Sequence, residues 1–291
     1  MTNLVSYLIY GLVWLISLLP FRILYFFSDV FYLLVCYVIR YRKAVIEINL
    51  KKTFPEKTDE ERVKIQHDFY HHFCDTIFET IKLLNISEKS IKRRYKFSNP
   101  DFADEYFDNK DGVVIILGHF CNWEWAASFP IWNEKCDLLP IYKPLHNEIL
   151  DKMFINMRSR FGGQPLPKKN TLRVMIKAKE DRRPSMTCFI GDQTPTKHNI
   201  NYWTNFLNQD TPIFIGVERI ARKLDQPVYY STLAKIKRGY YEVGMQLICE
   251  KPKETAEFEI TETHTRMLER DIIAHPAYWL WSHKRWKHSR N

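Results

Sequence analysis

A histidine and a glutamate five residues apart could act together as an acid–base pair. His119 and Glu124 follow the apolar run Gly112–Leu117, in the segment Gly-His-Phe-Cys-Asn-Trp-Glu. An imidazole can take a proton from a hydroxyl while a carboxylate fixes its tautomer and stabilises the imidazolium that forms. On one continuous helix the two side chains would lie about 140° apart. We therefore predict that His119 stays in a turn as the general base, and that a helix starting near Asn122 lets Glu124 orient it.

Other chemistry is conceivable in the same part of the chain. Cys121 could be the nucleophile of a lipid hydrolase, but it lies two residues from His119 and has no recognisable protease or thioesterase context. The simplest alternative is a surface histidine beside an unrelated glutamate. His67, His71 and His72 fall on one predicted helix, yet no acidic or third ligand follows at a useful spacing. We predict that the protein has no metal and no cofactor.

Strands and helices alternate along most of the chain. Gly112–Leu117 has the continuous apolar character of a strand that is buried on both faces. Further strands are predicted at Leu138–Tyr142, Met186–Ile190, Val228–Ile236 and Tyr241–Cys249. Helices are predicted at Asn122–Trp132, Asn147–Phe161, Thr171–Lys179, Pro212–Lys223 and Glu262–Ala274. This order indicates an α/β fold with a central, mostly parallel or mixed β-sheet flanked by helices, in which catalytic groups commonly follow the carboxyl ends of strands.

A helical pattern also covers residues 42–84, with a break at Phe54-Pro55. Thr58 or Asp59 can cap the second helix of this region. An apolar side chain then recurs every fourth residue, at Phe69, Phe73, Ile77 and Ile81. We predict that these four side chains form one apolar stripe.

The first forty residues have the composition of a hydrophobic membrane-anchor helix or hairpin. Leu4–Leu19 holds no charge and would span about 24 Å as a helix, short of the roughly 30 Å hydrocarbon core. A second apolar run, Val30–Ile39, ends in a basic cluster that favours a cytoplasmic location for the following domain. One short or tilted span, two helices dipping into one leaflet, and a hairpin buried on the domain all stay open. Residues 1–21 hold no Lys or Arg and no small-residue cleavage site follows, so no signal peptide is predicted.

Length and composition favour one large domain behind this anchor. The 291 residues are 45% hydrophobic and 15% aromatic, which excludes disorder. We divide the chain into an anchor, residues 1–40, and a single domain, residues 41–291. Six cysteines without any Cys-x-x-Cys are typical of reduced intracellular thiols. The formal net charge of +9 predicts an acidic partner, such as nucleic acid, anionic lipid or an acidic protein.

Several short segments together resemble one family, the bacterial lipid A biosynthesis acyltransferases of the late lauroyl/myristoyl transferase group. They occur in the family's order over nearly the whole chain: Asn49–Pro55, Gly118–Glu124, Tyr142–Pro144, Arg158–Gly162, Asp192-Gln193 and Trp279–Lys287. The sequence departs from the family pattern where Lys143 replaces an arginine, where Trp286 replaces a phenylalanine, and in the Thr-Pro-Thr-Lys that follows Gln193. These departures leave the acyl chain and the acceptor open.

The resemblance implies transfer of a fatty acyl chain from an acyl carrier protein thioester to a hydroxyl of a lipid A precursor or a related membrane glycolipid. It places the reaction at the cytoplasmic face of the inner membrane, with His119 as base and Glu124 as its partner. Acyl carrier protein is strongly acidic, which agrees with the basic charge of the chain. An exposed basic run at residues 283–290, with Lys284 and Arg285, is then expected to contact the carrier protein or the membrane surface. Nucleic acid is not expected, because no nucleic-acid fold motif is present.

The resemblance also suggests residues around the reacting atoms. Attack on a thioester forms a tetrahedral oxyanion, which needs positive or N–H donors nearby. We expect Arg158 and Arg160 near that charge or near a lipid phosphate, and Asn122 and Gln193 among the groups that contact substrate. Asp192 is expected to shape the pocket rather than transfer protons.

Three alternatives stay open beside this assignment. The two arginines could be solvated charges at a helix C-terminus. The protein could be a non-catalytic lipid-binding or scaffold protein that keeps the fold without the chemistry. An acyltransferase could also act on an aminolipid or another acceptor that is not lipid A.

Overall fold

A seven-stranded β-sheet forms the centre of the computed structural model, which describes residues 2–290. The strand order is β1-β9-β8-β2-β5-β3-β4, and every neighbouring pair is parallel except the antiparallel β8–β9 hairpin. The strands are β1 Tyr95–Phe97, β2 Val113–Leu117, β3 Asp137–Tyr142, β4 Leu166–Pro167, β5 Ser185–Ile190, β8 Val228–Lys237 and β9 Tyr240–Cys249. A separate two-stranded sheet pairs β6 Trp203–Phe206 with β7 Gln209–Pro212.

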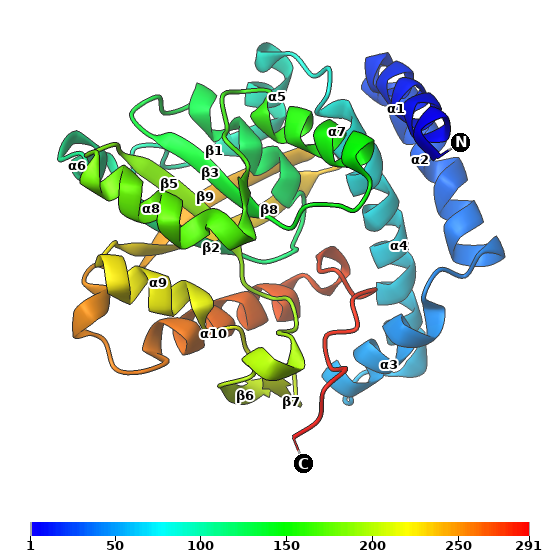
Figure 1. Ribbon diagram of the computed structural model, residues 1–291. Helices are drawn as coiled ribbons and strands as arrows, with labels where there is room; N and C mark the ends of the chain where they lie inside the picture. The colour runs from blue at the N-terminus through cyan, green and yellow to red at the C-terminus, as the bar shows by residue number, and fades with distance from the viewer. Residues whose placement is uncertain (1, 291) are drawn as a thin grey trace.

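Helices cover both faces of the sheet (Figure 1). The α-helices are α1 Thr2–Leu18, α2 Phe21–Leu33, α3 Lys43–Thr53, α4 Asp59–Lys82, α5 Glu88–Arg94, α6 Asp104–Asp108, α7 Glu148–Ser159, α8 Thr171–Glu180, α9 Gly216–Leu224 and α10 Glu259–Ala274. A π-helical turn, η1 Leu34–Val38, continues α2, and the 3-10 helices are η2 Trp123–Ile131, η3 Lys168–Asn170, η4 Lys197–Asn199, η5 Pro252–Glu254 and η6 Pro276–Tyr278. The predicted α/β class, with a mostly parallel sheet flanked by helices, is confirmed.

The two central strands carry the site at their carboxyl ends. All but the last residue of β2 are buried, as expected for a parallel strand covered on both faces. β2 and β5 are parallel neighbours with Leu117 opposite Ile190. Each strand is followed by a glycine and then by a polar residue, His119 after β2 and Asp192 after β5. The register therefore brings these two polar residues side by side.

Two predicted helices differ in detail from the structure. The helix expected over Pro212–Lys223 begins only at Gly216, because the residues up to Pro212 form the second strand of the β6–β7 hairpin. Leu207 and Asn208 have positive φ angles of 52° and 61° at the turn of that hairpin, a conformation typical of tight two-residue connections. The helix expected over Asn122–Trp132 is the 3-10 helix η2, which contains Pro130.

Helix α4 buries polar side chains as well as apolar ones. The predicted cap is present, since Thr58 accepts from the backbone N–H of Glu61 and the Glu61 carboxylate accepts from that of Thr58. Of the predicted apolar stripe only Phe69 is fully buried. The fully buried residues of this helix also include Gln66, His72, Asp75, Thr76, Glu79 and Lys82. Several of them find polar partners outside α4: α2 supplies them to Asp75 and Glu79, β8 supplies Lys235 to His72, and carbonyls at the end of α1 accept from Lys82.

The N-terminal helices lie at one side of the molecule (Figure 1). α2 packs on α4, and α1 packs on α4 and α7. Phe21–Val38 is one helical segment long and apolar enough to cross a bilayer, whereas the apolar helix before it is shorter. Among the described residues, 19 of the 25 exposed large apolar side chains lie between Leu4 and Tyr41. These two helices, α1 and α2, are called the N-terminal hairpin below; they pack on α4 and α7 along one side and present apolar side chains on the other.

Candidate active site

His119 is held by the carboxylate of Asp192. Its Nδ1 lies 2.7 Å from Asp192 Oδ1, and its backbone N–H donates to Asp192 Oδ2 over 2.8 Å. The indole N–H of Trp279 donates to the same Oδ2 over 2.8 Å. The carboxylate that orients His119 is thus Asp192. This corrects the prediction that Glu124 would orient the histidine, whereas the expectation that Asp192 shapes the pocket rather than transfers protons stays a prediction.

The electrostatics of this pair suit a general base. Burial alone would raise the pKa of Asp192, but the neighbouring His119 and the hydrogen bonds from His119 and Trp279 hold it well below its usual range. An ionised Asp192 accepts a hydrogen bond from Nδ1–H of His119. The other ring nitrogen, Nε2, then carries no proton and keeps its lone pair. The side-chain nitrogen of Gln193 lies 3.3 Å from Nε2 and can donate to it. An acceptor hydroxyl would have to take the place of this amide.

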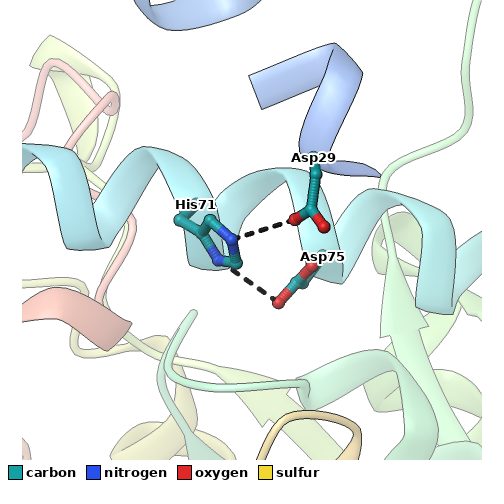
Figure 2. Close-up of side chains that lie close together, drawn as sticks. All are labelled: Asp29, His71 and Asp75. Carbon is teal, nitrogen blue, oxygen red and sulfur yellow. Dashed lines mark ion pairs between the residues drawn. The ribbon is translucent and has the colours of Figure 1, made fainter. Parts of the chain in front are cut away.

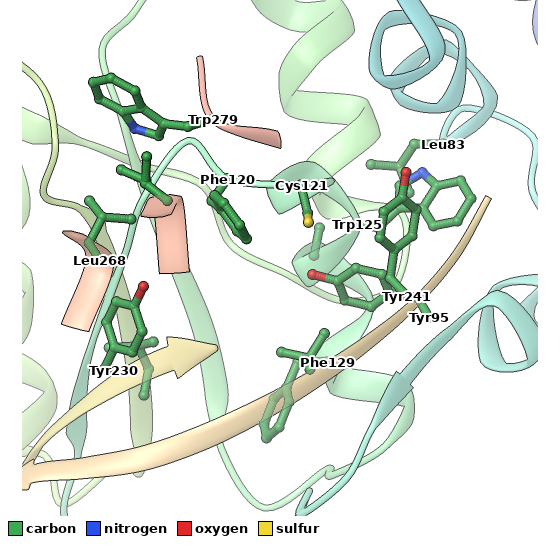
Figure 3. Close-up of a cluster of buried hydrophobic side chains, with 14 of the residues drawn as sticks. Leu83, Tyr95, Phe120, Cys121, Trp125, Phe129, Tyr230, Tyr241, Leu268 and Trp279 are labelled. Atoms are coloured by element: carbon green, nitrogen blue, oxygen red, sulfur yellow. The ribbon is translucent and has the colours of Figure 1, made fainter. Parts of the chain in front are cut away.

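The loop after β2 is pinned into the core. Cys121 has a positive φ of 50°, an unusual conformation for a residue other than glycine. Its backbone N–H donates to the carbonyl of Tyr278, and Leu280 N–H donates to the carbonyl of His119. Figure 3 shows Phe120, Cys121 and Trp125 within a cluster of buried hydrophobic side chains. The loop is therefore held at Cys121 and two residues before it by the segment Tyr278–Leu280.

Cys121 is not available as a nucleophile. Its side chain is buried, and its Sγ–H donates to the carbonyl of Leu233 over 3.7 Å. Burial raises the pKa of this thiol well above its usual range, so the reactive thiolate is disfavoured. The geometry thus argues against the hydrolase alternative.

Glu124 is paired with Arg158. The guanidinium donates from Nε to Glu124 Oε2 over 3.0 Å and from Nη2 to Oε1 over 2.7 Å. η2 begins after Asn122 as expected, but this bidentate pair turns the Glu124 carboxylate toward α7. Burial would lower the pKa of Arg158, but Glu124 outweighs it and the net shift is upward. Of the two predicted arginines, Arg158 lines the site cavity.

Two other predicted contacts are not made in this geometry. Arg160 donates to the backbone carbonyls of Leu84 and Ile86, 2.9 Å away in each case, after the end of α4. Asn122 is fully buried beneath the loop, where its carbonyl oxygen accepts from Trp125 N–H at the start of η2. Neither side chain faces the cavity, so neither can contact an oxyanion from its present position.

A cavity of about 710 Å³ opens beside His119. Its basic lining consists of Lys143, Arg158, Lys168, Lys169 and Lys287. Its apolar lining includes Ile141, Leu172, Phe189, Phe214, Val217 and Ile220. The cavity thus offers positive charge together with a large apolar surface. The lysines of η3 were not predicted, because nothing in their spacing distinguishes them from solvated charges.

The C-terminal basic run is only partly on the surface. Lys284 and Lys287 are exposed, but Arg285 is 1% exposed and donates to the carbonyl of Pro212. The guanidinium also lies 5.9 Å from the ring centre of Phe206. Arg285 therefore packs the β6–β7 hairpin against the tail. It cannot serve as part of an exposed docking surface, which corrects that expectation.

A second histidine–carboxylate cluster lies away from the cavity. Figure 2 shows His71 on α4 between Asp29 of α2 and Asp75 of α4. His71 Nε2 lies 3.0 Å from Asp29, and its Nδ1 lies 3.6 Å from Asp75. Arg238 donates to both carboxylates over 2.6 Å, and the Lys235 ammonium lies 3.8 Å from Asp75, so two cations already balance the two carboxylates. Asp75 follows His71 by four residues on α4, which corrects the expectation that no acidic residue follows these histidines at a useful spacing. The other two members could not be predicted from local sequence, because Asp29 and Arg238 are 209 residues apart.

Comparisons with known proteins agree over almost the full length. The family model for the bacterial lipid A biosynthesis acyltransferases matches residues 1–288. The chain is 19% identical over 280 residues to the lipid A biosynthesis palmitoleoyltransferase of Escherichia coli K12 and 21% identical over 280 residues to the lipid A biosynthesis lauroyltransferase of that strain. Each alignment covers 95% of this chain and 89% of the relative.

Proposed function

The chain belongs to the bacterial lipid A biosynthesis acyltransferase family, and from this premise we propose that it transfers a fatty acyl chain from an acyl carrier protein thioester to a hydroxyl of a lipid A precursor or a related membrane glycolipid. The observation that carries the proposal is the His119–Asp192 pair beside a cavity that is both basic and apolar. The names of the E. coli relatives support a lipid A acceptor, since both refer to lipid A biosynthesis.

In the proposed mechanism His119 acts on the acceptor hydroxyl. Nε2 takes the hydroxyl proton while the oxygen attacks the thioester carbonyl carbon, and Asp192 stabilises the imidazolium that forms. The tetrahedral intermediate then collapses, the carbon–sulfur bond breaks, and His119 returns the proton to the leaving thiolate. The products are the ester and the free thiol of the carrier. No additional reactant is needed for this balance.

Arg158 and Gln193 are the donors best placed for the negative charge of the intermediate or for a substrate phosphate. Both line the cavity. Gln193 can turn its amide to the oxyanion once a hydroxyl occupies Nε2. Glu124 holds the guanidinium of Arg158 in a fixed bidentate geometry, so we assign Glu124 as the positioning residue of Arg158.

The two sides of the cavity suit the two parts of the donor. The apolar lining along Phe189, Phe214 and Val217 suits an acyl chain. Lys168 and Lys169 at the rim suit the phosphate of a phosphopantetheine arm and the acidic surface of a carrier protein. An acyltransferase acting on an aminolipid would use the same base and the same acyl site, so the acceptor must be decided by experiment.

The N-terminal hairpin supports a position at the membrane surface, and we assign it to one leaflet of the inner membrane with the domain on the cytoplasmic face. Its outer side is apolar, whereas its inner side makes polar contacts with α4 and α7, such as Ser28 with Asp75 and Asn147 with Ser6. A helix bound along its length to a globular domain lies in the plane of the membrane more readily than across it. Exposed Arg22, Arg40 and Arg42 can reach anionic headgroups.

Mass spectrometry of membrane lipids tests the proposed function. Cells producing the protein should contain a lipid with one more acyl chain, and cells producing Asp192→Asn at the same level should lack it. Cys121→Ala should keep the product, which separates the acyltransferase from a cysteine hydrolase. If the lipids of cells with and without the protein are identical, and the purified protein binds lipid without transferring acyl groups, the scaffold alternative is correct.

A further inference from the structure

A buried glutamate lies at the junction of the N-terminal hairpin, the sheet and the loop that carries His119. Glu79 of α4 is 1% exposed. Its Oε1 accepts from the hydroxyl of Tyr25 on α2 over 2.8 Å. Its Oε2 accepts from the side-chain N–H of Asn122 over 2.7 Å and from the hydroxyl of Tyr241 on β9 over 2.8 Å. Three segments that are distant in sequence therefore meet at one carboxylate.

The hydrogen bond between Glu79 and Asn122 can affect His119, because Asn122 and His119 lie in the same loop. Asn122 uses both ends of its amide, since the nitrogen donates to Glu79 and the oxygen caps η2 at Trp125. It directly follows Cys121, the residue with positive φ, and lies three residues after His119. The backbone carbonyl of Glu79 also accepts from the indole N–H of Trp125 over 2.9 Å. The side chain and the backbone of one residue thus fix the end of this loop.

The chemistry of the three donors explains why the residue is a glutamate. A carboxylate has only acceptors and can satisfy two hydroxyls and one amide N–H together. A glutamine of the same shape would aim its own N–H₂ at one of these donors. The three donors carry no charge that would stabilise the ionised carboxylate. Burial, and the negative charge of Asp75 nearby, raise the pKa of Glu79 to about 7. A buried acid without a hydrogen-bonded cation is costly for stability, so its presence calls for a role beyond packing.

We infer that Glu79 is a positioning residue for the reaction at His119, acting through Asn122, and that its contact with Tyr25 joins the lipid-facing hairpin to the same loop. The inference rests on the proposed acyl transfer for its effect on turnover. Its structural half, the hold on the loop, does not depend on that function.

The test compares Glu79→Gln with a variant that removes another buried contact of the same interface. Ser28→Ala removes the 2.8 Å hydrogen bond from Ser28 to Asp75 between α2 and α4 but does not touch the loop. We expect Glu79→Gln to lower kcat about 10-fold with the KM for the acyl donor within about twofold of the parent, because the base is displaced and the donor site is kept. Ser28→Ala should keep kcat within about twofold.

A second variant removes the same hydrogen bond by changing its donor, Asn122. Asn122→Ala should lower kcat about as much as Glu79→Gln does, and the double variant should lose less than about twofold more, because residues that act as a unit are not additive. If one single variant fails to fold, the loss of kcat in the other single variant still tests the link. Two separate losses that multiply in the double variant would overturn the inference.

Amide hydrogen exchange gives a readout that does not depend on activity. Peptides covering residues 118–125 should exchange at least about 10-fold faster in Glu79→Gln than in the parent, and at the parent's rate in Ser28→Ala. Unchanged exchange together with normal turnover in Glu79→Gln overturns the inference. If the parent transfers no acyl group while exchange still accelerates only in Glu79→Gln, the proposed function is wrong and the hold of Glu79 on the loop is supported.

Discussion

Two regions of the molecule combine a histidine with carboxylates, and only one of them faces a cavity. His119 and Asp192 lie at the carboxyl ends of neighbouring strands beside a space of about 710 Å³. His71, Asp29 and Asp75 lie between α2 and α4, where Arg238 bridges both carboxylates. The first region leaves a lone pair for a reactant, whereas the second is neutralised from within. Residue types are therefore a poor guide to a site unless access and charge balance are known.

Two buried acids, Asp192 beside His119 and Glu79 beneath the loop that follows it, differ in their partners. Asp192 has an imidazole as partner and its pKa is held low, whereas the partners of Glu79 are two hydroxyls and an amide and its pKa is raised to about 7. Both are fully buried. The partner, not the burial, decides which acid is charged near neutral pH.

The largest contrast is expected when each histidine is removed. His119→Ala should reduce turnover at least about 100-fold, because general-base catalysis is lost. His71→Ala should change turnover by less than about twofold, because this ring faces Asp29 and Asp75 and not the cavity. Steady-state acyl transfer by folded variants checks both values. Comparable losses in the two variants would mean that the assignment of the reactive region is wrong.

A large effect on stability is expected in the other region. Arg238→Met should lower the free energy of unfolding by about 3 kcal/mol, because it removes the guanidinium that bridges Asp29 and the buried Asp75 and leaves Asp75 with the longer ion pair to Lys235, 3.8 Å away. Urea unfolding in detergent measures this change. Turnover per folded molecule should stay near that of the parent. A stable variant with impaired turnover would instead place Arg238 in the reaction.

The pKa values predict opposite pH windows for the two acids. Glu79 has a folded pKa near 7 and an unfolded value near 4.5, so the stability it contributes is complete below about 4.5 and is lost as the pH rises through 7. The slope is at most about 1.4 kcal/mol per pH unit. The pKa of Asp192 is lowered, so the pH dependence has the opposite sign. The stability that Asp192 contributes is present at neutral pH and is lost only as the pH falls below the usual carboxyl range. Unfolding of the parent and of Glu79→Gln between pH 4.5 and 7 should differ by this slope, and parallel curves would contradict it.

The smallest effect is expected from the basic rim of the cavity. Lys168→Gln with Lys169→Gln should raise the KM for acyl carrier protein about threefold and leave kcat unchanged, because exposed charges mainly steer encounter. Added salt should reduce the difference, since such charges are screened over about 8–10 Å. Lys51→Gln with Lys52→Gln, which changes exposed lysines away from the cavity, is the matched control. Equal behaviour of both double variants would exclude this rim as the docking site.

The fold could be predicted well from the sequence because most of its central strands are continuous apolar runs. The predicted Met186–Ile190 and Tyr241–Cys249 each lack only the first residue of the observed strand, and an apolar run in an alternating chain has few other interpretations. The short β1 and β4 and the β6–β7 hairpin were missed. The residues Gln209–Pro212 of that hairpin follow no clear alternation and contact the C-terminal tail, where Arg285 donates to Pro212.

The site was predicted only in part, for a physical reason. His119 was identified from its place after a strand, but its partner was sought nearby in sequence. Asp192 occupies the same position after the neighbouring strand, and the pairing of Leu117 with Ile190 makes the two residues adjacent. The equal spacing from each strand was visible in the sequence and would have indicated this pair. By contrast, no local pattern predicts that α4 buries Glu79, because its partners come from Tyr25 and from Tyr241.

The bridge from Asp29 to Arg238 also bears on how the protein is made. The hairpin leaves the ribosome first, yet the arginine that neutralises Asp29 lies 209 residues later. At about 5–20 residues per second, the two are separated by roughly 10–40 s of synthesis. During that interval the helix has an apolar side and an acid without its arginine partner, a combination that a membrane interface accommodates. Nascent chains stalled before residue 238 should therefore already sediment with membranes, so that the domain assembles on a helix that has reached the lipid before it.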